Sequence, residues 1–131
     1  MIVLDASAAA ELLLGTEPGH QVAELIRNPD ETIHAPHLLT VEVASVVRRI
    51  VASGDVTPAD GLRALHELLA LGVEFYPHDL LLERIFALRA NLTAYDAAYV
   101  ALAEGLNAVL VTTDAKLAGA PGHRARVRLI G

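Results

Sequence analysis

A chain of 131 residues, 53% of them hydrophobic, is long enough to bury the core of one compact domain, and we expect residues 1–131 to form a single domain. It has no cysteine, which excludes disulfides and thiolate metal sites, and no signal-peptide pattern or membrane-spanning apolar run, so we expect a cytoplasmic protein. The net charge of −6 neither requires nor excludes a nucleic-acid partner, because four acidic residues described below account for most of it.

Short apolar segments alternate with longer amphipathic segments along the chain, which predicts strands alternating with helices. Thr57, Pro58 and Asp60 place a cap, a proline and an acid in the order of a helix start, and Gly72 and Gly105 lie where helices are expected to end. In chain order we predict a strand over Met1–Leu4, helices over Ser7–Leu14 and Pro18–Asn28, a strand over Thr32–Ala35, helices over Leu38–Ser53 and Pro58–Leu71, a strand over Val73–Tyr76, helices over Leu80–Asn91 and Ala94–Glu104, and strands over Ala108–Val111 and Val127–Ile130.

This alternation predicts a mostly parallel central sheet whose strands are joined by right-handed helical crossovers. We therefore expect an α/β protein, built as a three-layer α/β/α sandwich. In open parallel sheets, ligands bind beyond the carboxyl ends of the strands. Asp5 ends the first predicted strand and Asp114 follows the fourth, so both carboxylates are expected at the same edge of the sheet.

Four carboxylates have apolar neighbours in the sequence: Asp5, Glu42, Asp96 and Asp114, here called the acidic quartet. Helical spacing places Glu42 on one face with Leu39, among side chains that point toward the core. Carboxylates are rarely buried unless they are paired or bind a cation, and the chain has a single lysine. The quartet therefore predicts a site for a divalent metal ion.

Each member of the quartet also has a structural interpretation as a helix cap or as half of an ion pair. The alternatives are Asp5 with Ser7 as the cap of the first helix, Glu42 paired with Arg49, Asp96 with Thr93 as a capping box, and Asp114 as the cap of the short turn Ala115–Ala118. A metal-ligating aspartate in the first turn of a helix also gains from the helix dipole, so the roles of cap and ligand are compatible.

Oxygen ligands alone favour Mg²⁺ or Mn²⁺ over zinc or copper. Such sites typically serve phosphoryl transfer, and the chain lacks a P-loop or Gly-x-Gly-x-x-Gly motif, so hydrolysis of a phosphodiester fits better than use of ATP. The hydroxyls of Ser7, Thr112 and Thr113 lie beside the predicted site and are expected to orient its carboxylates or waters.

Two further patterns have less specific interpretations. Tyr95 and Tyr99 lie four residues apart on one predicted helix and are expected at the edge of the core rather than as a platform for bases. Arg124, Arg126 and Arg128 alternate along the last strand, where arginines usually form one solvated face of an edge strand, although they could also contact phosphates.

The acidic quartet lies in four segments with distinctive neighbours: Val3–Ser7, Pro36–Val43, Thr93–Tyr99 and Val111–Leu117. In their residues, order and spacing these segments resemble the PIN-domain ribonucleases, and more narrowly the toxin component of prokaryotic VapBC toxin–antitoxin pairs. The resemblance spans essentially the whole chain. Its most specific parts are the Tyr-Asp-Ala-Ala-Tyr segment around Asp96 and the Thr-Thr-Asp segment that ends at Asp114.

The resemblance implies a PIN-like fold, a Mg²⁺- or Mn²⁺-dependent endoribonuclease toxin and inhibition by a cognate protein antitoxin that obstructs the site. It also implies a homodimer. By position, the acidic quartet matches the acidic residues of the family, and Thr112 matches a hydroxyl that supports them. Some relatives carry a further Asp or Asn shortly after the last acid, where this chain has Lys116 and Leu117. That departure puts a second metal position in doubt and makes a single-metal resting state plausible.

Other functions fit the sequence less well. A haloacid-dehalogenase-type phosphatase needs a second acid two residues after the first, where this chain has Ser7, and a mid-chain lysine, whereas the only lysine is Lys116. A receiver-type phosphoacceptor needs an aspartate directly after the third strand, which here leads into Tyr76, Pro77 and His78. A catalytically silent binding module with the PIN fold is disfavoured by the intact quartet but stays open.

Overall fold

The computed structural model describes all of residues 1–131 and contains one five-stranded sheet in which every pairing is parallel. The strand order is β3-β2-β1-β4-β5. The strands are β1 (Ile2–Leu4), β2 (Ile33–Pro36), β3 (Glu74–Tyr76), β4 (Val109–Thr112) and β5 (Arg126–Leu129). Each lies within one residue of its prediction at either end, and the predicted α/β class is confirmed.

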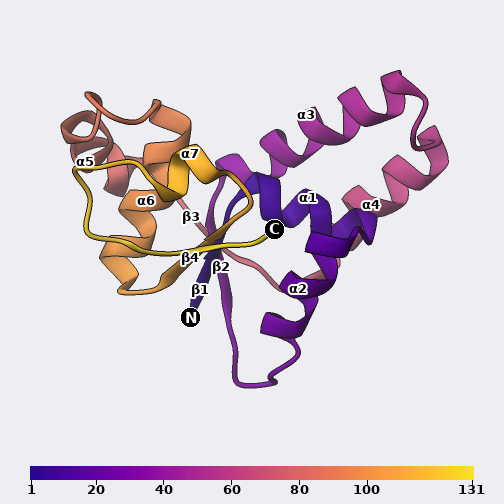
Figure 1. The fold of residues 1–131 in the computed structure, drawn as a ribbon, viewed down its shortest axis with the longest axis horizontal. Coiled ribbons are helices and arrows are strands. Elements are labelled where there is room, and N and C mark those ends of the chain that lie inside the picture. Colours follow the sequence, from indigo (N-terminus) through magenta and orange to yellow (C-terminus); the bar gives the residue numbers. More distant parts are fainter.

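Helices cover both faces of the sheet, so the three-layer prediction is also confirmed (Figure 1). One layer holds α1 (Ala6–Leu14), α2 (Glu17–Ile26), α3 (Leu38–Ser53) and α4 (Pro58–Ala70). The other holds the 3₁₀ turn η1 (His78–Leu81), α5 (Leu82–Ala87), α6 (Ala94–Leu106) and α7 (Ala115–Ala118). None of these helices has the length and apolar composition needed to cross a bilayer.

Three predicted helices had wrong bounds, and the first of them, expected over Pro18–Asn28, ends two residues earlier at Ile26. The helix expected over Leu80–Asn91 is a 3₁₀ turn followed by the six-residue α5, and its apolar residues Leu80 and Phe86 are largely exposed instead of packing into the core. The helix expected to end at Glu104 continues through Gly105 to Leu106. It ends there because Asn107 adopts a left-handed conformation (φ 52°), in which its N–H bonds back to the last turn.

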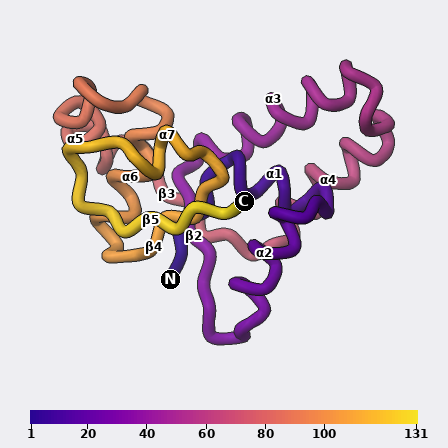
Figure 2. Tube along the Cα trace, in the orientation of Figure 1, coloured from indigo at the N-terminus to yellow at the C-terminus, as the bar shows by residue number.

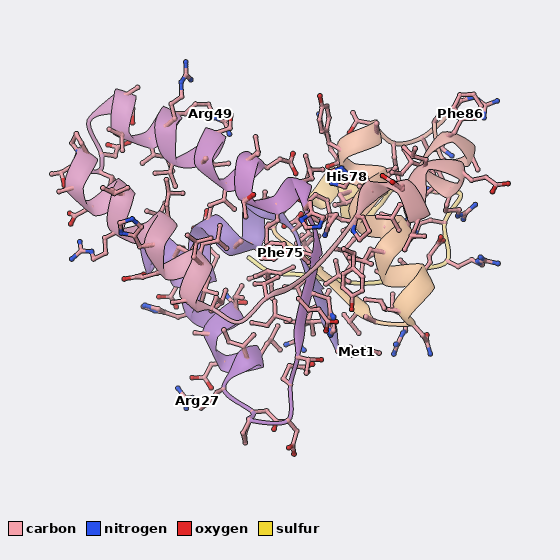
Figure 3. The ribbon with its side chains drawn as sticks, turned by 180° about the vertical axis from the view of Figure 1, so that it is seen from behind. Met1, Arg27, Arg49, Phe75, His78 and Phe86 are labelled. Carbon is pink, nitrogen blue, oxygen red and sulfur yellow. The ribbon has the colours of Figure 1, made fainter.

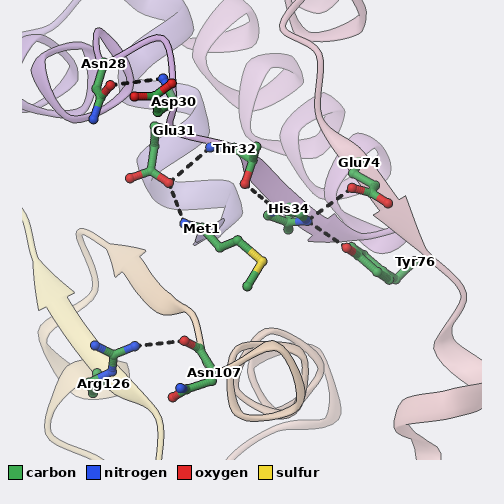
Figure 4. A network of polar contacts seen from close by, with 10 residues as sticks. All are labelled: Met1, Asn28, Asp30, Glu31, Thr32, His34, Glu74, Tyr76, Asn107 and Arg126. Atoms are coloured by element: carbon green, nitrogen blue, oxygen red, sulfur yellow. Dashed lines mark hydrogen bonds and ion pairs between the residues drawn. The ribbon is translucent and has the colours of Figure 1, made fainter.

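The predicted start of α4 was correct, since Thr57 Oγ1 accepts a hydrogen bond of 3.1 Å from the backbone N–H of Asp60. Buried polar groups in the sheet are satisfied as well. His34 on β2 is buried, and its ring nitrogens contact Thr32 Oγ1 at 2.8 Å and the hydroxyl of Tyr76 on β3 at 2.7 Å (Figure 4). This contact joins β2 to the edge strand β3.

The central strand β1 is where the order of the sheet reverses. The chain passes from β1 to β2 on one side and later returns to β4 on the other, so β1 pairs with both strands. Leu4, the last residue of β1, is the register partner of Val111, which precedes Thr112 at the end of β4. The residues that follow β1 and β4 therefore meet at the switch point where open α/β sheets bind ligands.

Candidate metal centre at the carboxyl edge of the sheet

Asp5 follows β1 and is the only buried member of the acidic quartet, with 5% of its surface exposed. Its Oδ1 accepts hydrogen bonds from Ser7 Oγ (2.7 Å) and the backbone N–H of Ala8 (2.9 Å), and its Oδ2 accepts one from Thr112 Oγ1 (2.5 Å). Burial raises the pKa of Asp5, and the charge of Asp114 raises it further, while these three donors oppose the shift. Asp5 is thus the cap of α1 and a fixed carboxylate of the site.

Two of the three hydroxyls predicted beside the site, those of Ser7 and Thr112, join the end of β4 to the start of α1, whereas the hydroxyl of Thr113 forms no hydrogen bond. Thr112 is fully buried, and besides donating to Asp5 its Oγ1 accepts a 3.0 Å bond from the backbone N–H of Asp114. Ser7 Oγ accepts a 3.0 Å bond from the N–H of Thr113 and lies 3.3 Å from Thr112 Oγ1. Thr113 contributes its backbone to this network. These bonds fix the two segments that carry Asp5 and Asp114.

Glu42 lies on α3, one turn beyond the start of that helix. The helix begins unusually, because the backbone N–H of Leu38 donates to Nε2 of His78 (2.9 Å), which reaches it from the segment after β3 (Figure 3). Glu42 is half-buried, and its Oε1 accepts a 2.5 Å hydrogen bond from the hydroxyl of Tyr99 on α6. It forms no ion pair with Arg49, so that alternative is not realised.

Like charges act on both partly buried carboxylates of the helices. Burial raises the pKa of Glu42, and the charges of Asp96 and Asp5 raise it further against the Tyr99 hydrogen bond. Burial also raises the pKa of Asp96, as do the charges of Asp114 and Asp5, against the hydroxyl of Thr93. The charge of Asp5 thus reaches the carboxyl groups of both α3 and α6.

Asp96 and Asp114 each lie at the start of a helix. The backbone N–H of Asp96 donates to Thr93 Oγ1 (3.2 Å), the cap of α6. Asp114 caps α7, with its Oδ1 accepting bonds from the N–H groups of Lys116 (2.9 Å) and Leu117 (3.4 Å). Its other carboxylate oxygen takes no part in these bonds. The capping interpretations are therefore correct for Asp5 and Asp114, whereas at α6 Thr93 caps the helix and the Asp96 carboxylate does not complete a capping box, which leaves carboxylate oxygens available to a ligand.

The acidic quartet forms one electrostatic cluster drawn from four separate elements. No lysine, arginine or histidine forms an ion pair with any of its members. The expectation that all four would be buried was wrong, since Glu42, Asp96 and Asp114 are partly exposed at the edge of the sheet, which solvent reaches. As placed, the side chains include no group of three or more acidic or histidine residues that could together hold one ion.

The residues present nevertheless fit a hard divalent cation. All the available donors are oxygens, which Mg²⁺ and Mn²⁺ prefer, and the unpaired negative charge is of the kind that such an ion neutralises. Mg²⁺ is usually held by one or two carboxylates, with water and substrate phosphate completing its shell. A site that offers few converging protein ligands is consistent with that mode of binding.

A groove of about 410 Å³ opens beside Glu42, between the start of α3 and the exposed ring of Tyr95. It continues into a smaller apolar hollow of about 210 Å³ lined by Leu38 and Tyr95 together with His78 and the start of α5. Glu42 is the member of the quartet that lines this open, partly apolar groove, and Arg49 lines it as well.

Sequence reasoning missed the polar roles of Tyr99 and His78. Tyr99 was expected at the edge of the core, and it is 2% exposed, yet its hydroxyl reaches Glu42. A buried tyrosine usually finds a partner for its hydroxyl, so a tyrosine three residues after Asp96 was a usable signal. His78 gave no local signal, because its bond to the start of α3 spans 40 residues.

Comparison with known proteins agrees with this geometry. Residues 2–122 match the sequence profile of the PIN domain. The chain is 43% identical to ribonuclease VapC12 of Mycobacterium tuberculosis over 130 residues, which cover 99% of both proteins. It is 48% identical to ribonuclease VapC9 of the same organism over 117 residues, covering 89% of this chain and 88% of VapC9.

Two solved structures share the fold. VapBC2 from Rickettsia felis, crystallised with a DNA fragment from its promoter, aligns over the whole of both chains with a TM-score of 0.71 at 15% identity. VapC20 of Mycobacterium tuberculosis, described as a toxin that cleaves the sarcin–ricin loop, aligns over 95% of this chain and 99% of its own with a TM-score of 0.68 at 16% identity. At these identities the two structures establish the fold alone.

The fold and the acidic edge of the sheet thus define a PIN domain. The profile match and the closely similar sequences show that the chain belongs to the PIN-domain family and, within it, to the VapC ribonucleases.

Proposed function

We propose that this protein is an endoribonuclease toxin that hydrolyses RNA phosphodiester bonds with the help of Mg²⁺ or Mn²⁺ held by the acidic quartet. One observation carries the proposal. Four carboxylates from separate elements lie near the switch point of the sheet, where burial and the charges of their neighbours raise the pKa values of Asp5, Glu42 and Asp96, and no basic side chain pairs with any of the four. Holding such charges together is unfavourable unless a cation is bound there.

When bound, a divalent cation supplies positive charge that stabilises the phosphodiester transition state and makes water more acidic. The chain's own residues hold and orient it. Asp5, fixed by three donors, provides the rigid carboxylate, and Asp114 provides an oxygen that its capping bonds leave free. Glu42 and Asp96 complete the negative surface from the two helix layers. Lys116, in place of a further acid, favours a single-metal resting state.

The residues around Asp5 weigh against the phosphatase alternative. The second acid of that mechanism is replaced by Ser7, whose hydroxyl is bound to Asp5 and to the N–H of Thr113. The silent binding module is tested by the experiment that follows.

The decisive experiment incubates purified protein, free of antitoxin, with RNA in Mg²⁺, Mn²⁺ or EDTA. Cleavage is expected with either ion and not in EDTA. Asp96→Asn and Asp114→Asn should each lower the rate by about a hundredfold or more while the protein stays folded. Asp60→Asn is the matched control, because Asp60 also follows a capping threonine by three residues but lies on α4, outside the quartet.

Unchanged cleavage by Asp96→Asn and Asp114→Asn would show that the activity belongs to a contaminant or to another site. A folded wild-type protein that binds RNA but does not cut it with either ion would identify the silent module instead.

We further propose that a cognate antitoxin obstructs the groove beside Glu42, that the toxin forms a homodimer and that it acts in the cytoplasm. Exposed apolar side chains on both sides of that groove, Val41 on α3 and Tyr95 on α6, support a protein contact there. Light scattering of the purified toxin, alone and with the product of a neighbouring short gene, tests both associations. A toxin that stays monomeric and unaffected by that product would contradict them.

A further inference from the structure

Basic residues are unevenly distributed in this acidic protein. Residues 84–131 contain six of the ten lysines and arginines but three of the sixteen acidic residues. Two of those three acids, Asp96 and Asp114, belong to the quartet, and the third, Glu104, is held by Arg84 in the one ion pair of this part of the chain. The remaining basic side chains here form no ion pair, although Arg124 lies close to Glu104, whose Oε2 accepts a 2.7 Å hydrogen bond from the backbone N–H of Arg124.

Three of them form a row along the edge strand β5 and the residues just before it: Arg124, which precedes the strand by two residues, and Arg126 and Arg128 on the strand, here called the arginine row. All three are exposed, whereas the intervening Ala125 and Val127 pack against the core. Alternation of this kind places the three arginines on one side of the strand, about 7 Å apart. β5 pairs with β4 alone, so its outer edge is open, and Figures 1 and 2 show it crossing the front of the molecule to the C-terminus.

The arginine row leads to the acidic quartet. Because β5 and β4 are parallel, Arg126 is the register partner of Val109 and Arg128 that of Val111, one residue before Thr112. At the other end of the row, Arg124 and Arg126 line a hollow of about 310 Å³ below the end of α6. Arg126 Nη2 donates to the backbone oxygen of Asn107 (2.8 Å) and is thereby held against this hollow (Figure 4).

A simpler interpretation is that the arginines only prevent the open strand from pairing with another sheet, as charged residues on edge strands often do. That role explains charge on β5. It does not explain why Arg126 and Arg128 form no ion pair in a chain with six more acids than bases, or why the row ends beside the quartet. An extended polyanion accounts for both.

We infer that the arginine row binds the sugar–phosphate backbone of the RNA strand that flanks the cut and guides it from the hollow below α6 to the quartet. This inference rests on the proposed ribonuclease function. Guanidinium groups bind phosphate oxygens well, and contacts with the backbone supply affinity without selecting a sequence. The row thus supplies affinity on a surface that is otherwise negative, while the quartet supplies the chemistry.

The test measures binding of a fluorescein-labelled 20-nucleotide poly(U) RNA in EDTA over a range of salt concentrations. The protein is the full chain carrying Asp96→Asn, with and without Arg124→Gln, Arg126→Gln and Arg128→Gln. Each phosphate neutralised on a single strand contributes about 0.7 to the slope of log affinity against log salt, so loss of the row should reduce the slope by about two. Affinity at low salt should fall at least tenfold.

The matched control in the same background is Arg27→Gln, Arg48→Gln and Arg63→Gln, which removes the same charge from α2, α3 and α4. Arg27 lies on the opposite side of the molecule from Phe86 of α5 (Figure 3). Arg27 and Arg63 each form an exposed ion pair, with Glu24 and Asp60 respectively. This control should retain the salt slope. Far-ultraviolet circular dichroism and thermal unfolding confirm that both variants are folded.

Equal slopes for the row variant and the control would overturn the inference, whether or not the row variant self-associates on size-exclusion chromatography. Self-association with an unchanged slope would assign the arginines to protection of the edge alone. The proposed function is tested separately by cleavage with wild-type protein. Cleavage by the wild-type protein together with an unaffected slope would contradict the role of the arginine row alone. A reduced slope without cleavage would contradict the proposed nuclease and the guiding of RNA to a cut, and would retain only RNA binding by the row.

Discussion

The hydroxyl of Tyr99 on α6 donates a 2.5 Å hydrogen bond to Oε1 of Glu42 on α3, joining the two helix layers at the candidate metal centre. Burial raises the pKa of Tyr99, and the hydrogen bond to Glu42 and the charges of Glu42, Asp5 and Asp96 raise it further, so the hydroxyl keeps its proton and acts as a donor. The bond fixes one oxygen of Glu42 and leaves the other without a hydrogen bond inside the protein.

Tyr99→Phe tests this bond with little change in volume. We expect the protein to lose about 1–3 kcal/mol of stability, because a carboxylate oxygen loses its donor. We also expect cleavage to require several times more Mn²⁺ for half-maximal rate, since Glu42 is less well oriented. Tyr95→Phe is the control, because that ring is exposed and should tolerate the change. An unchanged Mn²⁺ requirement would limit Tyr99 to a structural role.

Thr112 is the link between Asp5 and Asp114, since its hydroxyl donates to one and accepts from the backbone of the other. Thr112→Val keeps the shape and removes both bonds in a buried position, which should cost about 1–3 kcal/mol. Cleavage should fall with it, whereas Thr112→Ser, which keeps the hydroxyl, should retain most of the activity. Urea unfolding and cleavage rates measured together decide the matter. Equal activity of the valine and serine variants would contradict the orienting role.

The fold was predictable because its signals are local. Apolar runs, the cap at Thr57 and the aspartate after β1 each reflect a few neighbouring residues, and the parallel alternation then places Asp5 and Asp114 at one edge. The segment over Leu80–Asn91 was less predictable, since its apolar pattern resembles a buried helix and only packing reveals that Leu80 and Phe86 face outward.

The carboxylates of the candidate site could be predicted from the sequence, whereas their depth of burial and the hydrogen bonds that hold them could not. Helical spacing gives the face on which Glu42 lies, but not its depth, so burial was overestimated. Tyr99 donates a hydrogen bond to Glu42, 57 positions away, and His78 accepts one from the N–H of Leu38, 40 positions away. Such contacts arise only when the layers pack. Thr112 was identified because it directly precedes Thr113 and Asp114 in the chain.

Removing charge from the quartet should stabilise the metal-free protein or leave it unchanged. Asp114→Asn keeps the cap of α7, because asparagine caps as well as aspartate, and Glu42→Gln keeps an oxygen for the hydroxyl of Tyr99. Both changes relieve repulsion between like charges. Thermal unfolding in EDTA measures the effect. A large loss of stability in either variant would indicate that these carboxylates are primarily structural.

The stabilisation produced by Mn²⁺ should depend on pH with a defined sign. The pKa values of Asp5, Glu42 and Asp96 are raised above the ordinary 3.8 of aspartate and 4.5 of glutamate. In their protonated forms these groups therefore stabilise the folded protein. This contribution is fully present at pH below the ordinary pKa values and is lost as the pH rises through the pKa values of the folded state. A cation needs the deprotonated forms, so it offsets repulsion only above that range.

We therefore expect Mn²⁺ at about a hundred times its dissociation constant to add about 2.7 kcal/mol near neutral pH, and much less near pH 4. The pKa of Glu31 is lowered by the N-terminal amine and that of Glu104 by Arg84. The stability that these two carboxylates give the protein is therefore lost in acid, with or without the ion. The difference between paired thermal scans with Mn²⁺ and with EDTA removes their effect. Asp96→Asn should abolish most of that difference, and a difference that does not change with pH would place the bound Mn²⁺ away from the quartet.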